Sequence, residues 1–156
     1  MKTAVFAGSF DPFTFAHQDL VERGLLVFDK IIIGVGVNPS KKGLMDFDDR
    51  EAAIAQLFAN EDRVTVSQFR GLTVDFCQRR GAAYLLRGLR NTNDFEFENA
   101  IAQNNLLLAP EIETCFLMAR SGLGHISSTI VRDILTNNGD VTELVPEEVL
   151  QYINIG

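Results

Sequence analysis

The chain has 156 residues, close to the size of one ordinary domain and long enough to bury a core without disulfide or metal support. Hydrophobic residues make up 46% and charged residues 22%, which excludes intrinsic disorder, and no apolar run approaches the roughly 18 residues of a membrane-spanning helix. The formal net charge of −7 argues against nucleic-acid wrapping and against anchoring to anionic lipid. We therefore predict one water-soluble domain over residues 1–156, without a nucleic-acid or membrane partner.

The chain ends and the cysteines give further expectations. The first residues, 1–7, lack the apolar segment and cleavage site of a secretory signal, so we expect a cytoplasmic protein. Cys77 and Cys115 lie in apolar segments without CxxC or Cys/His spacing, so both are predicted to be small core residues. No Lys or Arg follows Arg132, and we interpret residues 133–156 as an acidic helical segment that forms a solvated cover.

Short apolar runs predict five buried strands, at residues 3–8, 30–37, 63–67, 82–87 and 113–118. Helical spacing of apolar residues fills the intervals between them. The residues with this spacing are Val21, Gly24, Leu25 and Phe28, then Ala53, Ile54, Leu57 and Phe58, then the segment 72–80, then Phe97, Ala100, Ile101 and Leu108. A fifth amphipathic helix follows the last strand and ends near Gly139.

This alternation predicts the α/β class: a single doubly wound, Rossmann-like domain with a five-stranded parallel sheet and helices on both faces. Ligands of such sheets bind where the strands end at their carboxyl side. Functional residues are therefore expected directly after the predicted strands.

The segment after the first strand is GSFDPFTFAH, which runs from Gly8 to His17. We predict that His17 begins the next helix, where its side chain and the free N–H groups of the first turn favour a phosphate. Two alternatives stay open: a histidine that only caps the helix, and a Ser9/His17 nucleophile and base pair. No GxSxG elbow surrounds Ser9.

Basic residues follow two other strands in this acidic protein. Lys41 and Lys42 come after the second strand and form either a phosphate site or a solvated charge pair. Arg87 and Arg90 come after the fourth, where two guanidinium groups can clamp phosphates. The alternative for these arginines is salt bridges to the acidic residues that follow, which are Asp94, Glu96 and Glu98.

Three consecutive hydroxyl residues open the helix after the fifth strand: Ser127, Ser128 and Thr129. Capping of a helix explains one such hydroxyl but not three. We therefore predict a second anion-binding cradle here, at the same sheet edge as the basic residues.

These motifs, GSFDPFTFAH, NPSKK, RGLRNTNDFEFE and ISSTIVRDI, span Gly8 to Ile134 in this order. They resemble the motifs of the bacterial phosphopantetheine adenylyltransferase family of the nucleotidyltransferase superfamily. The resemblance implies transfer of AMP from ATP to 4′-phosphopantetheine, giving dephospho-coenzyme A and pyrophosphate in coenzyme A biosynthesis. It also implies Mg²⁺ held mainly by substrate phosphates rather than by protein ligands, a homohexamer, and feedback binding of coenzyme A.

The resemblance assigns roles to matching residues. His17, Lys41 and Arg90 would be catalytic, with the first two at the α-phosphate and Arg90 at the leaving pyrophosphate. Phosphopantetheine would contact Ser9, Lys41, Thr73 and Arg87. ATP would contact Ser9, Phe10, His17, Gly88, Leu89, Arg90, Glu98, Leu123, Gly124, His125, Ile126, Ser127, Ser128 and Thr129. One departure is Ala16, which stands where the family usually has the glycine before the histidine.

Two other functions are weighed against this one. The first is a related nucleotidyltransferase that acts on another phosphate acceptor, such as glycerol phosphate or nicotinate mononucleotide. The second is a non-catalytic sensor of ATP or coenzyme A, which would not release pyrophosphate.

Overall fold

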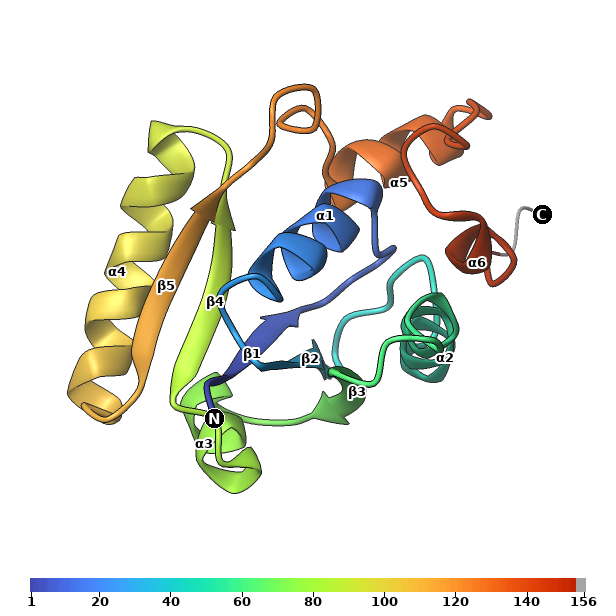
Figure 1. The fold of residues 1–156 in the computed structure, drawn as a ribbon. Helices are drawn as coiled ribbons and strands as arrows, with labels where there is room; N and C mark the ends of the chain where they lie inside the picture. The colour runs from blue at the N-terminus through green and yellow to red at the C-terminus, as the bar shows by residue number, and fades with distance from the viewer. Residues whose placement is uncertain (154–156) are drawn as a thin grey trace.

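The computed structural model describes residues 1–153 and contains a five-stranded sheet with the strand order β3-β2-β1-β4-β5 (Figure 1). All neighbouring strands are parallel, as a doubly wound α/β fold requires. The predicted α/β fold with a parallel sheet is therefore confirmed. The strands are β1 (Thr3–Gly8), β2 (Lys30–Gly36), β3 (Val64–Phe69), β4 (Tyr84–Leu89) and β5 (Glu113–Met118).

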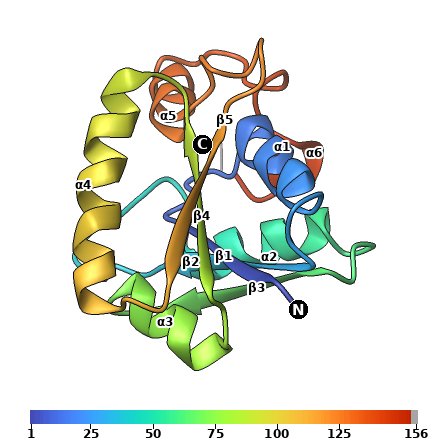
Figure 2. The ribbon, with the colours of Figure 1, turned by 60° about the vertical axis from the view of Figure 1, so that its left-hand side comes forward.

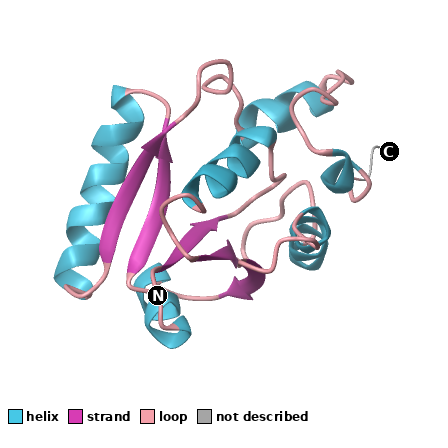
Figure 3. Cartoon of the chain, viewed as in Figure 1, coloured by secondary structure: helices cyan, strands magenta, loops and turns pink. Residues whose placement is uncertain are grey.

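Helices cover both faces of this sheet, and Figure 2 shows α4 and α1 on opposite sides of β4 and β5. The helices are α1 (Phe15–Gly24), α2 (Phe47–Leu57), α3 (Thr73–Arg80), α4 (Thr92–Leu108), α5 (Ser128–Thr136) and α6 (Glu147–Leu150). Figure 3 shows the loop that leaves the arrowhead of β5 and leads to α5, beside α1. Within residues 1–153, no helix combines the length and apolar character needed to cross a membrane.

The strands bury alternate residues against two separate groups of helices. In β1, Ala4 and Phe6 belong to the core shared with α1, α2, α5 and α6. Val5 and Ala7 belong to the core on the opposite face, which includes Phe76 of α3. This period of two follows from the strand geometry and fixes both layers of the fold.

The fourth strand differs most from its predicted bounds. It covers 84–89 instead of 82–87, because Gly81 ends α3 in the left-handed conformation (φ 68°) and residues 82 and 83 connect it to the strand. Arg87 and Gly88 therefore lie inside the strand, and Arg90 directly follows it. The third strand is likewise shifted towards its carboxyl end, to 64–69.

Two helices also differ from the sequence pattern. The first ends at Gly24, so Leu25 and Phe28 are buried after it rather than within it. In α4 the side chains of Phe97 and Leu108 are 68% and 58% exposed, whereas Ala102 is the only buried residue of the helix. The helical spacing was correct there, but the face it predicts as buried was wrong.

The carboxyl-terminal segment is less helical than predicted. The fifth helix ends at Thr136, close to the predicted end near Gly139, and within the described residues only the short α6 follows it. Val141, Val145 and Val149 are buried in the core, so the segment is more than a solvated cover. The last part of the predicted segment, 154–156, lies outside the described residues. Of the two cysteines, Cys77 is buried as predicted, and the remaining one, in β5, is half-buried.

Candidate active site

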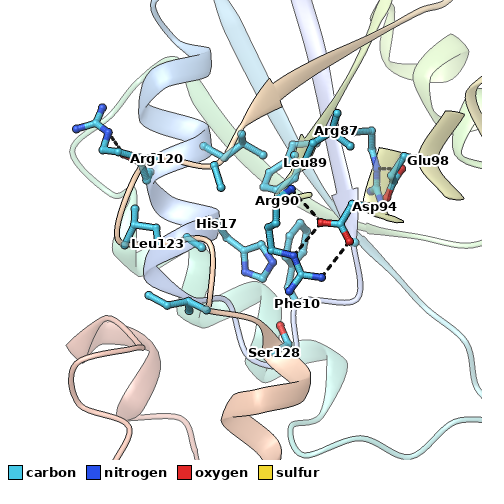
Figure 4. A pocket seen from close by; sticks show the side chains of 18 of the residues that line it. Phe10, His17, Arg87, Leu89, Arg90, Asp94, Glu98, Arg120, Leu123 and Ser128 are labelled. Carbon is cyan, nitrogen blue, oxygen red and sulfur yellow. Dashed lines mark hydrogen bonds and ion pairs between the residues drawn. The ribbon is translucent and has the colours of Figure 1, made fainter. Parts of the chain in front are cut away.

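A cavity of about 330 Å³ lies where β1, β4 and β5 end, between the start of α1 and the loop after β5. We call it the central cavity. Figure 4 shows His17, Phe10, Arg90 and Ser128 gathered in one part of it. Its lining residues are Phe6, Ala7, Gly8, Ser9, Phe10, Ala16, His17, Asp19, Leu20, Arg23, Arg87, Gly88, Leu89, Arg90, Asp94, Glu98, Ala119, Arg120, Leu123, Ile126 and Ser128.

His17 is both part of a helix cap and part of the cavity wall. Thr14 is the residue that caps α1, and its side chain accepts a hydrogen bond from the His17 backbone N–H at 3.4 Å. In return, the Thr14 backbone N–H donates to His17 Nδ1 at 3.0 Å. This reciprocal arrangement is a capping box with histidine in the third helical position, so His17 does not begin the helix. Because Nδ1 accepts, the ring proton is on Nε2, which can act as a donor.

The surroundings of the ring keep it neutral. Phe10 and Phe13 each place their ring centroid 5.1 Å from that of His17. Burial, as the largest cause, together with the positive charges of Arg87 and Arg90, lowers the pKa of His17 from 6.5 to about 4. At neutral pH the side chain is therefore an uncharged hydrogen-bond donor.

This low pKa predicts a pH dependence of stability. Between about pH 6.5 and pH 4 the unfolded chain binds a proton at His17 that the folded chain does not, so the free energy of unfolding falls as the pH falls. The contribution lost by pH 4 is roughly 3 kcal/mol. Urea unfolding of wild type and of His17→Gln across this pH range measures the contribution. An equal pH dependence of the free energy of unfolding in the two proteins would contradict a lowered pKa of His17.

Arg87 forms the wall between the central cavity and a second cavity. Its Nε and Nη2 donate to the two carboxylate oxygens of Glu98, at 2.9 and 2.6 Å, and Nη1 donates to the carbonyl of Ala7. The bidentate geometry fixes the guanidinium plane. The salt-bridge alternative for this arginine is thus observed, while the side chain still faces both cavities.

Arg90, which lies between β4 and α4, is held in the same manner by Asp94 in the first turn of α4. Its Nε donates to Asp94 at 2.9 Å, and Nη2 donates to the other carboxylate oxygen at 3.2 Å. The hydrogen bond from Arg90 lowers the pKa of Asp94. Asn91 caps the helix by accepting from the Asp94 N–H, so this ion pair is built onto a fixed helix start.

The second cavity, about 160 Å³, lies between β4 and α4. Thr73, the first residue of α3, lines it together with Arg87. The remaining lining residues are Ala7, Leu85, Glu98, Ile101, Ala102, Asn105 and Thr114. Two of the four residues that the resemblance gives to phosphopantetheine therefore meet here.

Lys41 is not part of the central cavity. It is exposed in the loop after β2 and lines a third cavity of about 460 Å³, with Lys42 and Arg132. Ser9 lies on both the central and the third cavity and so connects them. The convergence of basic groups that the sequence predicts is thus divided between two neighbouring cavities.

The three hydroxyl residues have three different partners. Ser127 caps α5 by accepting from the Ile130 N–H at 3.2 Å. Ser128 Oγ donates to the carbonyl of Pro12 at 2.8 Å, and Thr129 Oγ1 accepts from Arg132 at 3.2 Å. Of the three, only Ser128 lines the central cavity.

These contacts predict different results for alanine variants of the three. Ser127→Ala should lower the free energy of unfolding by about 1 kcal/mol, the usual effect of losing a cap. Only Ser128→Ala should reduce nucleotide turnover with little loss of stability, since its side chain alone of the three faces the cavity. Thermal unfolding beside steady-state kinetics checks both statements; a normal turnover for a folded Ser128→Ala protein would contradict the second.

The structure adds wall residues that the sequence did not indicate. Asp19 lies between two arginines, with Arg23 and Arg120 each 3.3 Å from one of its carboxylate oxygens. The spacing of these three residues along the chain matches no motif that predicts a site. Conversely, Gly124 and His125 are exposed and do not line the central cavity, whereas their neighbours Leu123 and Ile126 do.

No group of three or more His, Cys, Asp or Glu side chains suited to a metal occurs in the part of the chain that the structure describes. The carboxylates of the central cavity, Asp19, Asp94 and Glu98, are each paired with arginine.

Comparisons with known proteins agree with this geometry. A cytidylyltransferase-like family model matches residues 5–134, which includes the strands and loops that build all three cavities. The chain is 48% identical to the phosphopantetheine adenylyltransferase of Flavobacterium psychrophilum, over 96% of this chain and 98% of the relative. It is 46% identical to that of Christiangramia forsetii and 42% identical to that of Geotalea daltonii, with at least 96% of each chain covered. The chain belongs to the cytidylyltransferase-like family and, within it, to the phosphopantetheine adenylyltransferases.

Proposed function

We propose that the protein transfers AMP from ATP to 4′-phosphopantetheine, which yields dephospho-coenzyme A and pyrophosphate in coenzyme A biosynthesis. The observation that carries this proposal is the central cavity itself. It presents a neutral histidine donor together with Arg87 and Arg90, and Arg87 also lines the second cavity, where an acceptor can lie. The names of the relatives support the same reaction.

The reaction needs no protein nucleophile. An oxygen of the acceptor phosphate attacks the α-phosphorus of ATP, the bond to the bridging oxygen breaks, and pyrophosphate leaves with the electron pair. Catalysis then depends on positioning and on stabilising negative charge. His17 Nε2–H donates to an α-phosphate oxygen and stabilises the negative charge that develops there in the transition state.

The wall residues divide between the two substrates. Phosphopantetheine contacts Ser9, Thr73 and Arg87, with Lys41 reaching the reacting phosphates from the loop side. Arg90 and the start of α5 take up the charge of pyrophosphate. ATP contacts Ser9, Phe10, His17, Gly88, Leu89, Arg90 and Glu98, and from the loop after β5 and the start of α5 it contacts Leu123, Ile126 and Ser128.

Several wider features belong to the same proposal. Mg²⁺ enters with ATP, bound mainly by its phosphate oxygens, and neutralises part of their charge. Coenzyme A, which contains the product's structure, binds the same cavities as a feedback inhibitor. The enzyme works in the cytoplasm as a homohexamer, for which the exposed apolar residues of α4, including Phe97 and Leu107, offer contact surface.

The test is pyrophosphate release by the purified protein with ATP and Mg²⁺. Phosphopantetheine should support release, while glycerol phosphate and nicotinate mononucleotide should not. Release with one of the other acceptors would identify a related transferase, and no release with any of them would indicate a nucleotide sensor. Light scattering of the same sample measures the assembly.

A further inference from the structure

A buried ion pair outside the central cavity joins the loop after β1 to α2. Arg50 Nε lies 3.4 Å from Asp11 Oδ1, and only 4% of each residue is exposed. Arg50 also donates to the carbonyls of Met45, at 2.9 Å, and Ser9, at 3.1 Å. Burial of two charges is tolerated only with such additional hydrogen bonds, so the pair is a built feature of the fold.

The same pair holds the loop that carries Lys41. Asp11 accepts hydrogen bonds from the backbone N–H groups of Leu44 and Met45, each at 2.8 Å. Residues 38–46 contain no helix or strand. Within residues 1–153, the hydrogen bonds that join this loop to other segments all involve Asp11 or Arg50. Apart from the backbone bond between the Arg50 N–H and the Asp46 carbonyl at the start of α2, these two side chains supply all of them.

Gly43 shows how closely the loop approaches the pair. A Cβ atom at this position would overlap both the Asp11 carboxylate and the Arg50 guanidinium. The backbone thus passes directly against the charges two residues after Lys41, and only glycine leaves the space for it. Lys41 and Ser9 line the third cavity together with the pair.

We infer that the Asp11–Arg50 ion pair is a positioning device for AMP transfer, which fixes the 38–46 loop against Ser9 and thereby sets where Lys41 meets the phosphates. Neither residue lines the central cavity, so neither is a catalytic residue. The inference rests on the proposed function, in which Lys41 contacts the reacting phosphates.

A double-mutant cycle tests it. Asp11→Asn keeps the shape of the side chain but removes its charge, and should lower kcat/KM for phosphopantetheine about 10- to 100-fold. In a Lys41→Ala background the same change should cost less than about twofold, because the loop no longer carries a group to position. An equal loss in both backgrounds would show a general structural role and overturn the inference.

Amide hydrogen exchange supplies a local readout. In Asp11→Asn the amides of Leu44 and Met45 should exchange at least about tenfold faster, while Ile32 in the centre of the sheet should be unaffected. Unchanged protection of the two loop amides would likewise overturn the inference.

A second variant guards against misfolding of Asp11→Asn. Gly43→Ala keeps both charges but displaces the loop. It should therefore also lower kcat/KM for phosphopantetheine in the wild-type background, and much less in the Lys41→Ala background. Arg63→Ala is the matched control, because it also breaks an ion pair, the one between Arg63 and Glu61. Arg63 is half exposed, and neither residue lines any of the three cavities. This control variant should leave kcat/KM unchanged.

The two proposals fail in different ways. If the wild-type protein transfers no AMP to phosphopantetheine, the proposed function is wrong. If it transfers AMP and Lys41→Ala is as active as wild type, the function stands and the positioning role of the ion pair is overturned.

Discussion

Replacement of His17 by alanine is expected to lower kcat by about 10²–10³-fold or more, the effect of removing one preorganised donor from a catalytic site. The structure supplies the reason, since Nδ1 is occupied by the Thr14 N–H and Nε2–H remains for the α-phosphate. Dissociation constants for ATP and phosphopantetheine should change little, because the interaction strengthens mainly in the transition state.

The chain offers a matched control, since its only other histidine, His125, is exposed and does not line the central cavity. His125→Ala should retain wild-type kcat. Single-turnover kinetics with both variants, beside their thermal unfolding, separate chemistry from stability. A folded His17→Ala protein with wild-type kcat would exclude a role for this side chain in the reaction.

Removal of the Arg87 side chain is expected to have the second largest effect. Arg87→Ala should weaken phosphopantetheine binding roughly ten- to hundredfold, the value of a lost charge-assisted contact. It should also lower the free energy of unfolding by about 2 kcal/mol, because the Glu98 carboxylate, 11% exposed, loses its partner.

A second substitution separates these two effects. Arg87→Ala combined with Glu98→Gln contains no unpaired carboxylate, so stability should return while acceptor affinity remains low. Isothermal titration and urea unfolding measure the two quantities. Recovery of affinity in the double variant would mean that Arg87 acts only by neutralising Glu98. Arg120→Ala removes a more exposed arginine of the same cavity and is the control, because it should leave phosphopantetheine affinity unchanged.

The elements of the fold were largely predictable because their signals are local. The first and last strands have the bounds that the apolar runs predicted, 3–8 and 113–118. The largest shift, that of β4, shows the limit of this reasoning, since the conformation of Gly81 delays the strand by two residues. A run of apolar residues does not specify where a preceding turn ends.

The placement of side chains in the site was less predictable. The sequence identified His17, Arg87 and Arg90 by their positions near strand ends, and all three line one cavity. It also placed Lys41 with them, but the loop after β2 carries that residue to a separate cavity. The path of a loop depends on which distant groups accept its hydrogen bonds, and spacing along the chain does not contain that information.

The sequence by itself determined the alternation of strands and helices along the chain, the parallel sheet, and the basic and hydroxyl residues at its edge. Hydrophobic periodicity and strand ends are properties of neighbouring residues. Only the tertiary structure decided the partners: Asp11 with Arg50, Arg87 with Glu98, and Thr14 with the ring of His17. The ring's low pKa and the geometry of the arginines result from burial and from charges on other elements, and these exist only once the chain has folded.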